Sequence, residues 1–332
     1  MIIMTFQPPK RLLLACLLPL LGLLLHASAF GAQPLENQAS KTQVVMLGTG
    51  NPQPDPDRSG AATAIVVDGT AYLVDFGPGV VRRAAAAARD KGITALEPTK
   101  IRVVFSTHLH SDHTTGLPDL ILSPWKMGRP FPLELYGPKG IKSMTEHVLA
   151  AYKEDIQIRT EGMEGASRDN YKVNVHEISS GVIYKDPKVT VTAFPTKHGD
   201  WQETYGYRFD TTDRSIVISG DTTPTQALID ACQGCDVLIH EALTLKFLNN
   251  PMRPELQGID IKSYSAKYHT TTTQLAEVAK EAKPGLLILY HNPITLQATK
   301  RPFASTPDDL LQEIKAAGYS GKVVVGRDLD VY

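Results

Sequence analysis

Cysteine is scarce in this chain of 332 residues, which contains only Cys16, Cys232 and Cys235. Cys232 and Cys235 are spaced C-x-x-C, but no second cysteine pair is present to complete a four-cysteine zinc site. The pair lies at the end of a predicted helix and before a predicted strand, whereas a thioredoxin-like redox pair follows a strand. The expected role is therefore structural, as either a small disulfide or two free thiols.

The chain also lacks an apolar run long enough to span a membrane comfortably. Its main apolar stretch, residues 12–25, is shorter than the ~20 residues of a membrane helix. Lys10 and Arg11 precede this stretch and small residues follow it at 27–29, which is typical of a cleavable secretory signal. We therefore expect residues 1–29 to be a signal peptide and the protein to be exported to the periplasm or the medium without a stable membrane anchor. An uncleaved membrane anchor is the alternative.

Positive charge is not in excess. The formal net charge is −1, and cleavage after residue 29 removes Lys10 and Arg11 but no acid, which leaves −3. Because binding of a polyanion favours a basic surface, we expect a small-molecule partner and no nucleic acid. The sequence leaves the oligomeric state open, including a homo-oligomer.

No internal repeat and no low-complexity segment follows the signal. Residues 30–42 are expected to be a loose leader, and residues 43–332 a single domain. Early strands form hairpin-like pairs and later strands alternate with helices, which predicts an α/β fold with mixed sheets covered by helices. Residues 155–185 are polar and are expected to form a long connection or flap. The patterns predict strands at 44–47, 62–67, 72–74, 103–105, 133–136, 189–194, 215–219, 237–239, 286–289 and 323–325, and helices at 79–89, 141–151, 225–231, 272–282 and 307–317.

The most informative stretch is residues 106–113, which reads STHLHSDH. It follows the predicted strand at 103–105 and precedes a predicted helix near Thr114. On such a loop, His108 and His110 can point one way while Asp112 and His113 turn toward a second point nearby. Four nitrogen and oxygen donors divided into two pairs are what a site for two metal ions needs.

Three further candidate ligands follow predicted strands. They are His198, Asp221 and His291. A carboxylate can bridge two cations and a histidine cannot, so Asp221 is the expected shared ligand. One metal would take His108, His110, His198 and Asp221, and the other would take Asp112, His113, His291 and Asp221. Imidazole and carboxylate donors favour two zinc ions, with Mn²⁺ or Fe²⁺ as alternatives.

The order of these motifs resembles the ribonuclease Z-like branch of the metallo-β-lactamase superfamily, which includes arylsulfatase-like and phosphodiesterase-like members. The resemblance spans residues 43–330 and rests on LGTG at 47–50 with Pro52, Pro54 and Arg58, LVDFG at 73–77, STHLHSDHTTGLP at 106–118, SGDT at 219–222, LIHEA at 238–242, His269 and LYH at 289–291. It implies a four-layer αββα sandwich that binds two zinc ions, and thus a catalytic domain.

The resemblance also implies that His269 and Glu241 lie beside the metals and assist the departing group. A carboxylate that orients an imidazole raises its pKa and lets it donate a proton. A helix-capping role is the alternative for His269. Asp75 is expected either to orient a ligand imidazole or to serve only in a turn, and His240 is expected to pack behind the site.

The chemistry expected from such a centre is attack by a metal-activated hydroxide, with Asp112 also orienting or deprotonating the water. A ribonuclease Z that matures tRNA would carry a long arm between the positions of His198 and Asp221, and residues 199–220 are too few to form one. We therefore expect an exported hydrolase of a small phosphate or sulfate ester. Loops at 123–130, with Trp125, and 199–207, with Trp201, are candidates for contacting it. Their aromatic side chains either stack on an aryl leaving group or cap the core.

Other activities remain open at this point. A ribonuclease Z-type endoribonuclease and a lactone or β-lactam hydrolase use the same centre, although the bridging Asp221 disfavours a dedicated β-lactamase. An iron-dependent oxidoreductase and a non-enzymatic metal-binding protein are the alternatives outside hydrolysis. The pair Glu241 and His269 disfavours mere metal binding, which does not require it.

Overall fold

The computed structural model describes residues 41–250, 255–256, 258–296 and 305–332. The predicted signal peptide and nearly all of the predicted leader lie outside these residues. Among the described residues, no helix has both the length and the apolar character needed to cross a membrane.

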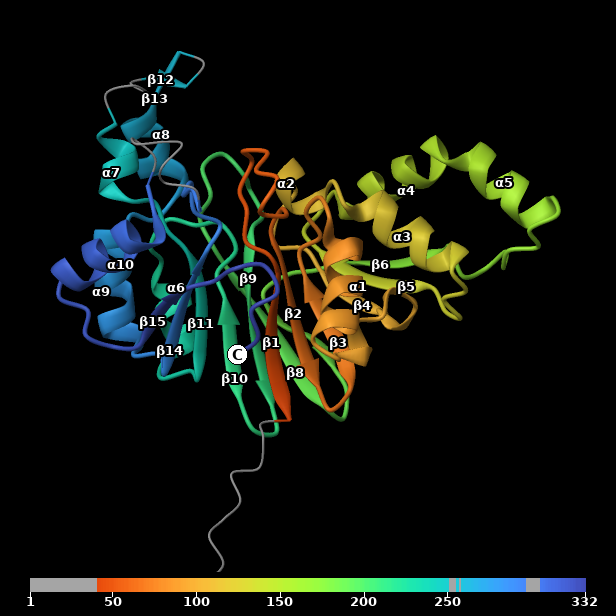
Figure 1. The fold of residues 1–332 in the computed structure, drawn as a ribbon, viewed down its shortest axis with the longest axis horizontal. Helices are drawn as coiled ribbons and strands as arrows, with labels where there is room; N and C mark the ends of the chain where they lie inside the picture. Colours follow the sequence, from red (N-terminus) through yellow and green to blue (C-terminus); the bar gives the residue numbers. More distant parts are fainter. Residues whose placement is uncertain (1–40, 251–254, 257, 297–304) are drawn as a thin grey trace, which may run out of the picture. The chain divides into compact units, whose positions relative to one another are not determined.

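Two β-sheets form the centre of the fold (Figure 1). The first sheet is built in chain order, with hairpin-linked antiparallel strands followed by parallel ones. Its strands are β1 (Thr42–Gly48), β2 (Ala62–Val67), β3 (Thr70–Val74), β4 (Val103–Phe105), β5 (Leu133–Gly137) and β6 (Val173–Glu177). Asp68 and Gly69 both have positive φ in the β2–β3 turn, as a tight two-residue hairpin requires.

The second sheet has seven strands in the order β15-β14-β11-β10-β9-β8-β7. The chain enters it through antiparallel neighbours and leaves it through parallel strands connected by helices. Its strands are β7 (Gly181–Lys185), β8 (Val189–Pro195), β9 (Tyr205–Thr211), β10 (Ser215–Ile218), β11 (Val237–Glu241), β14 (Leu286–Tyr290) and β15 (Val323–Val325).

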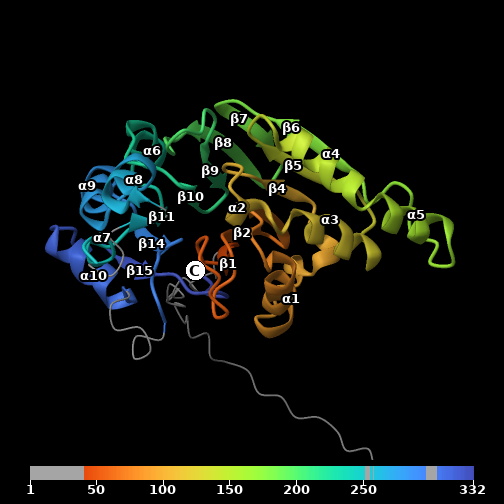
Figure 2. The same cartoon turned by 90° about the horizontal axis from the view of Figure 1, so that it is seen from above.

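Helices cover the outer face of each sheet (Figure 2). α1 (Val80–Asp90), α3 (Leu117–Lys126) and α4 (Ile141–Ala151) pack on the first sheet, and α6 (Gln226–Cys232), α9 (Thr272–Ala282) and α10 (Pro307–Ala316) pack on the second. A third apolar core fills the space between the sheets. Three cores between four layers confirm the predicted αββα sandwich. The shorter elements are α2 (Ser111–Thr114), α5 (Lys153–Glu161), α7 (Leu245–Leu248), α8 (Ile261–Tyr268), β12 (Glu255–Leu256), β13 (Ile259–Asp260) and 3₁₀ turns at Thr94–Leu96 and Pro98–Lys100.

Two expectations for loops are wrong. Residues 155–185 form most of α5 and the strands β6 and β7 rather than a flap. These two strands are the edges of the two sheets and are only partly covered, so their sequence is too polar to resemble a buried strand. Trp125 lies inside α3, where its buried indole donates a hydrogen bond to the Ser167 carbonyl oxygen at 2.9 Å. It is a core residue and cannot contact a substrate.

Cys232 and Cys235 form a disulfide at the end of α6, directly before β11. Both side chains are buried in the core between the second sheet and its helices. The pair has the expected structural position, and the structure selects the disulfide over two free thiols.

Candidate metal centre

The candidate ligands lie just beyond the ends of four strands that belong to both sheets. His108, His110, Asp112 and His113 follow β4, His198 follows β8, Asp221 follows β10, and His291 follows β14. Loops at the carboxyl ends of strands meet at one edge of a layered α/β fold, which is why segments far apart in the sequence converge here. The structure thus brings all seven predicted metal ligands into two adjoining groups.

The first ligand group consists of His108, His110 and His198. Nδ1 of His110 lies 3.0 Å from Nε2 of His108 and 3.0 Å from Nε2 of His198. Three ring nitrogens this close together face one small volume. Imidazoles adopt this arrangement around a metal ion.

The second ligand group consists of Asp112, His113 and His291. Nε2 of His291 lies 2.8 Å from Oδ2 of Asp112 and 3.2 Å from Nε2 of His113. His291 has a positive φ of 53°, a conformation that is uncommon outside glycine. Its backbone N–H donates to the Thr49 carbonyl oxygen at 3.0 Å, so a contact with the loop after β1 holds it in place.

Asp221 lies between the two groups and offers one oxygen to each. Its Oδ2 is 3.9 Å from Nε2 of His108 and 3.8 Å from Nε2 of His198. Its Oδ1 is 3.4 Å from Nε2 of His113 and has no hydrogen-bond partner although it is buried. A buried carboxylate oxygen without a partner is costly, and a cation removes that cost. The position of Asp221 is therefore the one that a bridging ligand would take.

The outward-facing nitrogens of several ligands are fixed by specific partners. Nδ1 of His108 pairs with Oγ1 of Thr107 at 3.0 Å, and Oγ1 of Thr107 in turn donates to the Asp75 carboxylate. Nδ1 of His113 pairs directly with Oδ2 of Asp75 at 2.7 Å, and Nδ1 of His198 donates to the Tyr268 carbonyl oxygen at 2.7 Å. Each contact leaves the other ring nitrogen facing the centre. Such contacts select the tautomer in which that nitrogen is free to bind a metal. Asp75 is thus placed to orient ligand imidazoles, the first of the two roles expected for it, rather than to serve only in a turn.

Burial keeps the first ligand group neutral. It lowers the pKa of His108 well below its usual value and lowers the pKa of His198 to about 4. A neutral imidazole is the form that binds a metal. Burial also acts on His113, but the carboxylates of Asp221 and Asp75 outweigh it and raise the pKa of His113. The donor set, its burial and its two converging clusters fit two metal ions, which the residues of each group would hold together with Asp221.

His269 and Glu241 form a pair beside both ligand groups. His269 ends α8, and its Nδ1 lies 2.9 Å from Oε1 of Glu241 at the end of β11. The ring centroid of His269 is 5.1 Å from that of His198 and 6.2 Å from that of His291. Burial alone would lower the pKa of His269, but the Glu241 carboxylate outweighs it and raises the pKa to about 9. The ring of His269 thus lies beside both ligand groups, and the following helix α9 is capped by Thr271 rather than by His269.

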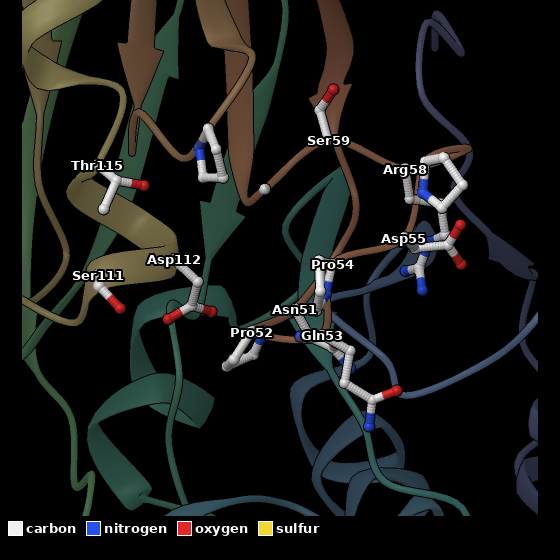
Figure 3. A pocket seen from close by; sticks show the side chains of 13 residues that line it. Asn51, Pro52, Gln53, Pro54, Asp55, Arg58, Ser59, Ser111, Asp112 and Thr115 are labelled. Atoms are coloured by element: carbon white, nitrogen blue, oxygen red, sulfur yellow. The ribbon is translucent and has the colours of Figure 1, made fainter.

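A cavity of about 560 Å³ opens beside the second ligand group. Figure 3 shows Asp112 and Ser111 of α2 on one side of it and the loop from Asn51 to Asp55 on the other. The lining contains no lysine, and the guanidinium of its one arginine, Arg58, is buried. The cavity reaches the centre at Asp112, and its lining offers no exposed positive charge.

Arg58 and Asp328 support the second ligand group from behind. Arg58 donates from Nη1 to the carbonyl oxygen of Asn292 at 2.8 Å and from Nη2 to that of Thr49. Asp328 accepts hydrogen bonds from the backbone of Thr49 at 2.9 Å and of Ser59 at 2.7 Å. Arg58 belongs to the resemblance described above, whereas no sequence signal marks Asp328, which joins the site from the end of the chain.

Of the remaining histidines, His240 is buried and its Nδ1 donates to the Glu241 carbonyl oxygen at 2.7 Å, in line with packing behind the site.

Trp201 lies in the predicted loop and its Nε1 donates to Nε2 of His110 at 2.8 Å. The loop between His198 and Asp221 is the β9–β10 hairpin with its flanking turns, as expected.

Comparison with known proteins gives consistent matches. The family model described as "Beta-lactamase superfamily domain" matches residues 70–292. Ribonuclease Z from Mycobacterium bovis (strain BCG / Pasteur 1173P2) is 30% identical over 290 residues, which cover 86% of this chain and 96% of the relative. Ribonuclease Z from Mycobacterium sp. (strain KMS) is 34% identical over 252 residues, 75% of this chain and 83% of the relative. Among solved structures, the short form of human tRNase Z is similar with a TM-score of 0.62 and 22% identity over 87% of this chain and 98% of that one.

Proposed function

Because the chain belongs to the ribonuclease Z-like branch of the metallo-β-lactamase superfamily, we propose that it hydrolyses phosphodiester bonds, with RNA as its substrate class. Membership in this family makes the chain a metal-dependent hydrolase. The proposal concerns which bond it cleaves. Relatives named ribonuclease Z align over most of their own length with this chain. They support the ribonuclease alternative better than a sulfate ester, and they oppose the expectation that nucleic acid is not a partner.

The observation that carries the proposal is the position of His269 beside the two ligand groups, where Oε1 of Glu241 holds its Nδ1 at 2.9 Å. The leaving group of a natural phosphodiester is an alkoxide, which departs far more readily when an acid protonates it. Since Nδ1 of His269 is engaged by Glu241, Nε2 is the atom left to give a proton to that oxygen. An aryl ester has less need of such a donor, because a phenolate departs without protonation.

The other residues of the site have separate roles. Metal ions bound by the two ligand groups and Asp221 would supply a hydroxide at neutral pH and would neutralise charge on the phosphate oxygens. Asp112 reaches the centre from α2 and borders the cavity, so it is placed to orient the attacking water. Thr107, Asp75 and the Tyr268 carbonyl keep the imidazoles in the orientation that this chemistry needs.

A small phosphodiester is the second candidate. The segment between His198 and Asp221 is a short hairpin, without the long arm that tRNA maturation is expected to need. The cavity beside Asp112 also lacks an exposed basic residue, and the whole chain has a net charge of −1. Both features favour a substrate with few phosphates.

We also propose that the protein is exported. The pattern of residues 1–29 supports this proposal, and so does the disulfide between Cys232 and Cys235, because disulfides persist mainly in oxidising compartments. Labelling free thiols in protein isolated from its native host, with and without prior reduction, tests the redox state. Thiols that react before reduction would argue against export.

One panel of substrates tests the reaction. Zinc-loaded protein is assayed with a precursor tRNA, a single-stranded RNA, bis(p-nitrophenyl) phosphate, p-nitrophenyl sulfate and nitrocefin. We expect turnover of the diesters and of RNA, and none of the sulfate or the β-lactam. An Asp221→Ala protein purified in parallel controls for contaminating nucleases. Faster turnover of the sulfate than of every diester would refute the proposal, and turnover of the aryl diester without RNA would select the second candidate.

A further inference from the structure

Trp201 is an exposed aromatic side chain at the edge of the metal centre. The residue is 37% exposed, and the centroid of its indole ring lies 5.0 Å from the ring centroid of His110 and 6.3 Å from that of His108. The chain's only other tryptophan, Trp125, is 2% exposed and belongs to the buried face of α3. Leaving a large aromatic surface in water has a cost, so its position over a ligand group calls for an explanation.

The loop that carries Trp201 is fastened to α8 by four contacts. His198 donates to the Tyr268 carbonyl oxygen, and the backbone N–H of Gly199 donates to the Lys267 carbonyl oxygen at 3.1 Å. The Asp200 carboxylate accepts hydrogen bonds from Nζ of Lys267 at 2.5 Å and from the Tyr268 hydroxyl at 2.7 Å. The indole is thus presented by a loop that is already ordered, which reduces the entropy lost when a ligand binds.

Gly199 shows how closely this loop and α8 approach each other. Gly199 has a φ of 58°, and a Cβ atom added there would lie 1.8 Å from the ring of Tyr268. A side chain at this position would both strain the backbone and push the loop away from α8. The close approach places Trp201 two residues further on, next to His110.

The hydrogen bond to His110 does not account for the indole's position once a metal is bound. Nδ1 of His110 faces the other ligands, so a metal bound there leaves the ring proton on Nε2. Nε2 is then a donor and can no longer accept from Nε1 of Trp201. The exposed indole, 5.0 Å from the ring of His110, is then available to a ligand at the centre.

We propose that Trp201 determines substrate specificity by stacking on an aromatic group joined to the phosphate, either a nucleobase or an aryl ring. This inference rests on the proposed function and narrows it to phosphodiesters that carry an aromatic substituent. Replacing the aromatic side chain on which one base stacks by alanine weakens binding by about 5- to 150-fold.

Matched monophosphates separate stacking from phosphate binding. Calorimetry of zinc-loaded protein compares phenyl phosphate with methyl phosphate, and uridine 5′-monophosphate with ribose 5-phosphate. In each pair the phosphate is retained and only the aromatic group is lost. We expect Trp201→Ala to weaken phenyl phosphate or uridine monophosphate by about 10-fold and to leave the two non-aromatic ligands unchanged. If Trp201→Ala weakens phenyl phosphate more than uridine monophosphate, the aromatic group of the substrate is an aryl ring. The opposite result identifies a nucleobase.

Trp201→Phe is the matched control, because it keeps an aromatic face and removes the indole N–H. It should retain most of the affinity lost in Trp201→Ala, and both variants should bind the same number of zinc equivalents as the parent. Zinc titration should change the tryptophan emission of the parent and leave that of Trp201→Phe unchanged.

The outcomes distinguish this inference from the function on which it rests. If the parent and Trp201→Ala bind phenyl phosphate and uridine monophosphate equally well, the stacking role is wrong and the phosphodiesterase proposal survives. If all four ligands weaken equally in Trp201→Ala, or zinc is lost, Trp201 supports the metal centre and does not select substrates. If the parent binds no monophosphate at all, the stacking proposal fails, and the substrate panel alone decides the phosphodiesterase proposal.

Discussion

The two ligand groups have similar donors but are held in place by different partners. In the first ligand group, the outer nitrogens of His108 and His198 meet a hydroxyl and a backbone carbonyl, both of them neutral. In the second, the outer nitrogen of His113 meets the carboxylate of Asp75. A carboxylate behind an imidazole makes it a stronger ligand, and a neutral partner only orients it.

The two ligand groups also differ in which segments of the chain hold their histidines in place. The second group depends on His291, which is held by the loop after β1 and, through Asn292 and Thr49, by the buried Arg58. The first group depends on His198, which is held by α8 through the Tyr268 carbonyl oxygen. The two metal positions therefore rest on separate parts of the fold. Asp221 lies beside both groups, whereas Asp75 contacts the second group directly and reaches the first only through Thr107. Substitutions should separate the two positions accordingly.

The largest effect is expected from Asp221→Ala. Because Asp221 offers one oxygen to each group, its loss should lower the content of both metal ions and reduce activity by at least about 10⁴-fold, since hydroxide and Lewis acid are lost together. Elemental analysis of the dialysed protein measures the metal content directly.

His198→Ala and His291→Ala are the matched controls for Asp221→Ala. Each should weaken mainly the ion of its own group and leave the other near full occupancy. A result in which Asp221→Ala loses only one ion, the same ion as either control, would contradict a bridging Asp221.

The next effect concerns His269, which lies beside both groups and belongs to neither. His269→Ala should leave both metals in place and slow the hydrolysis of a diester with an alkoxide leaving group by about 10²- to 10⁴-fold. A p-nitrophenyl leaving group departs without protonation, so the same variant should slow the p-nitrophenyl diester much less. Equal slowing of both substrates, or loss of a metal ion, would show that His269 is not the proton donor.

Much of this site could be predicted from local sequence because each ligand follows a short apolar strand. The strand at 103–105 is buried on both faces, so its pattern is unambiguous, and the motif that follows it supplies four of the seven ligands. The ends of β8, β10 and β14 are equally clear, which is why His198, Asp221 and His291 could be named before their distances were known.

What could not be predicted depends on contacts that only the folded chain makes. Asp328 bonds to Thr49 across 279 positions of sequence, and no local pattern precedes it. The edge strands β6 and β7 bury too little surface to show an apolar pattern. Trp125 and Trp201 are equivalent as loop aromatics in the sequence, yet one is buried in α3 and the other lies against His110.

The smallest predicted effect compares Asp75→Asn with Thr107→Val. Asp75 contacts His113 directly, at 2.7 Å, but reaches His108 only through the Thr107 hydroxyl. Asp75→Asn should therefore weaken the ion of the second ligand group by about 10- to 100-fold and affect the first group less. Thr107→Val keeps the shape of the side chain but leaves Nδ1 of His108 without its partner, so it should weaken only the first group. Competition against a chromophoric zinc chelator resolves the two affinities in each variant, with His198→Ala and His291→Ala identifying which ion is which. If both variants weaken the same ion by the same factor, the two groups share one support through Asp75. A charged partner would then hold an ion no more tightly than a neutral one.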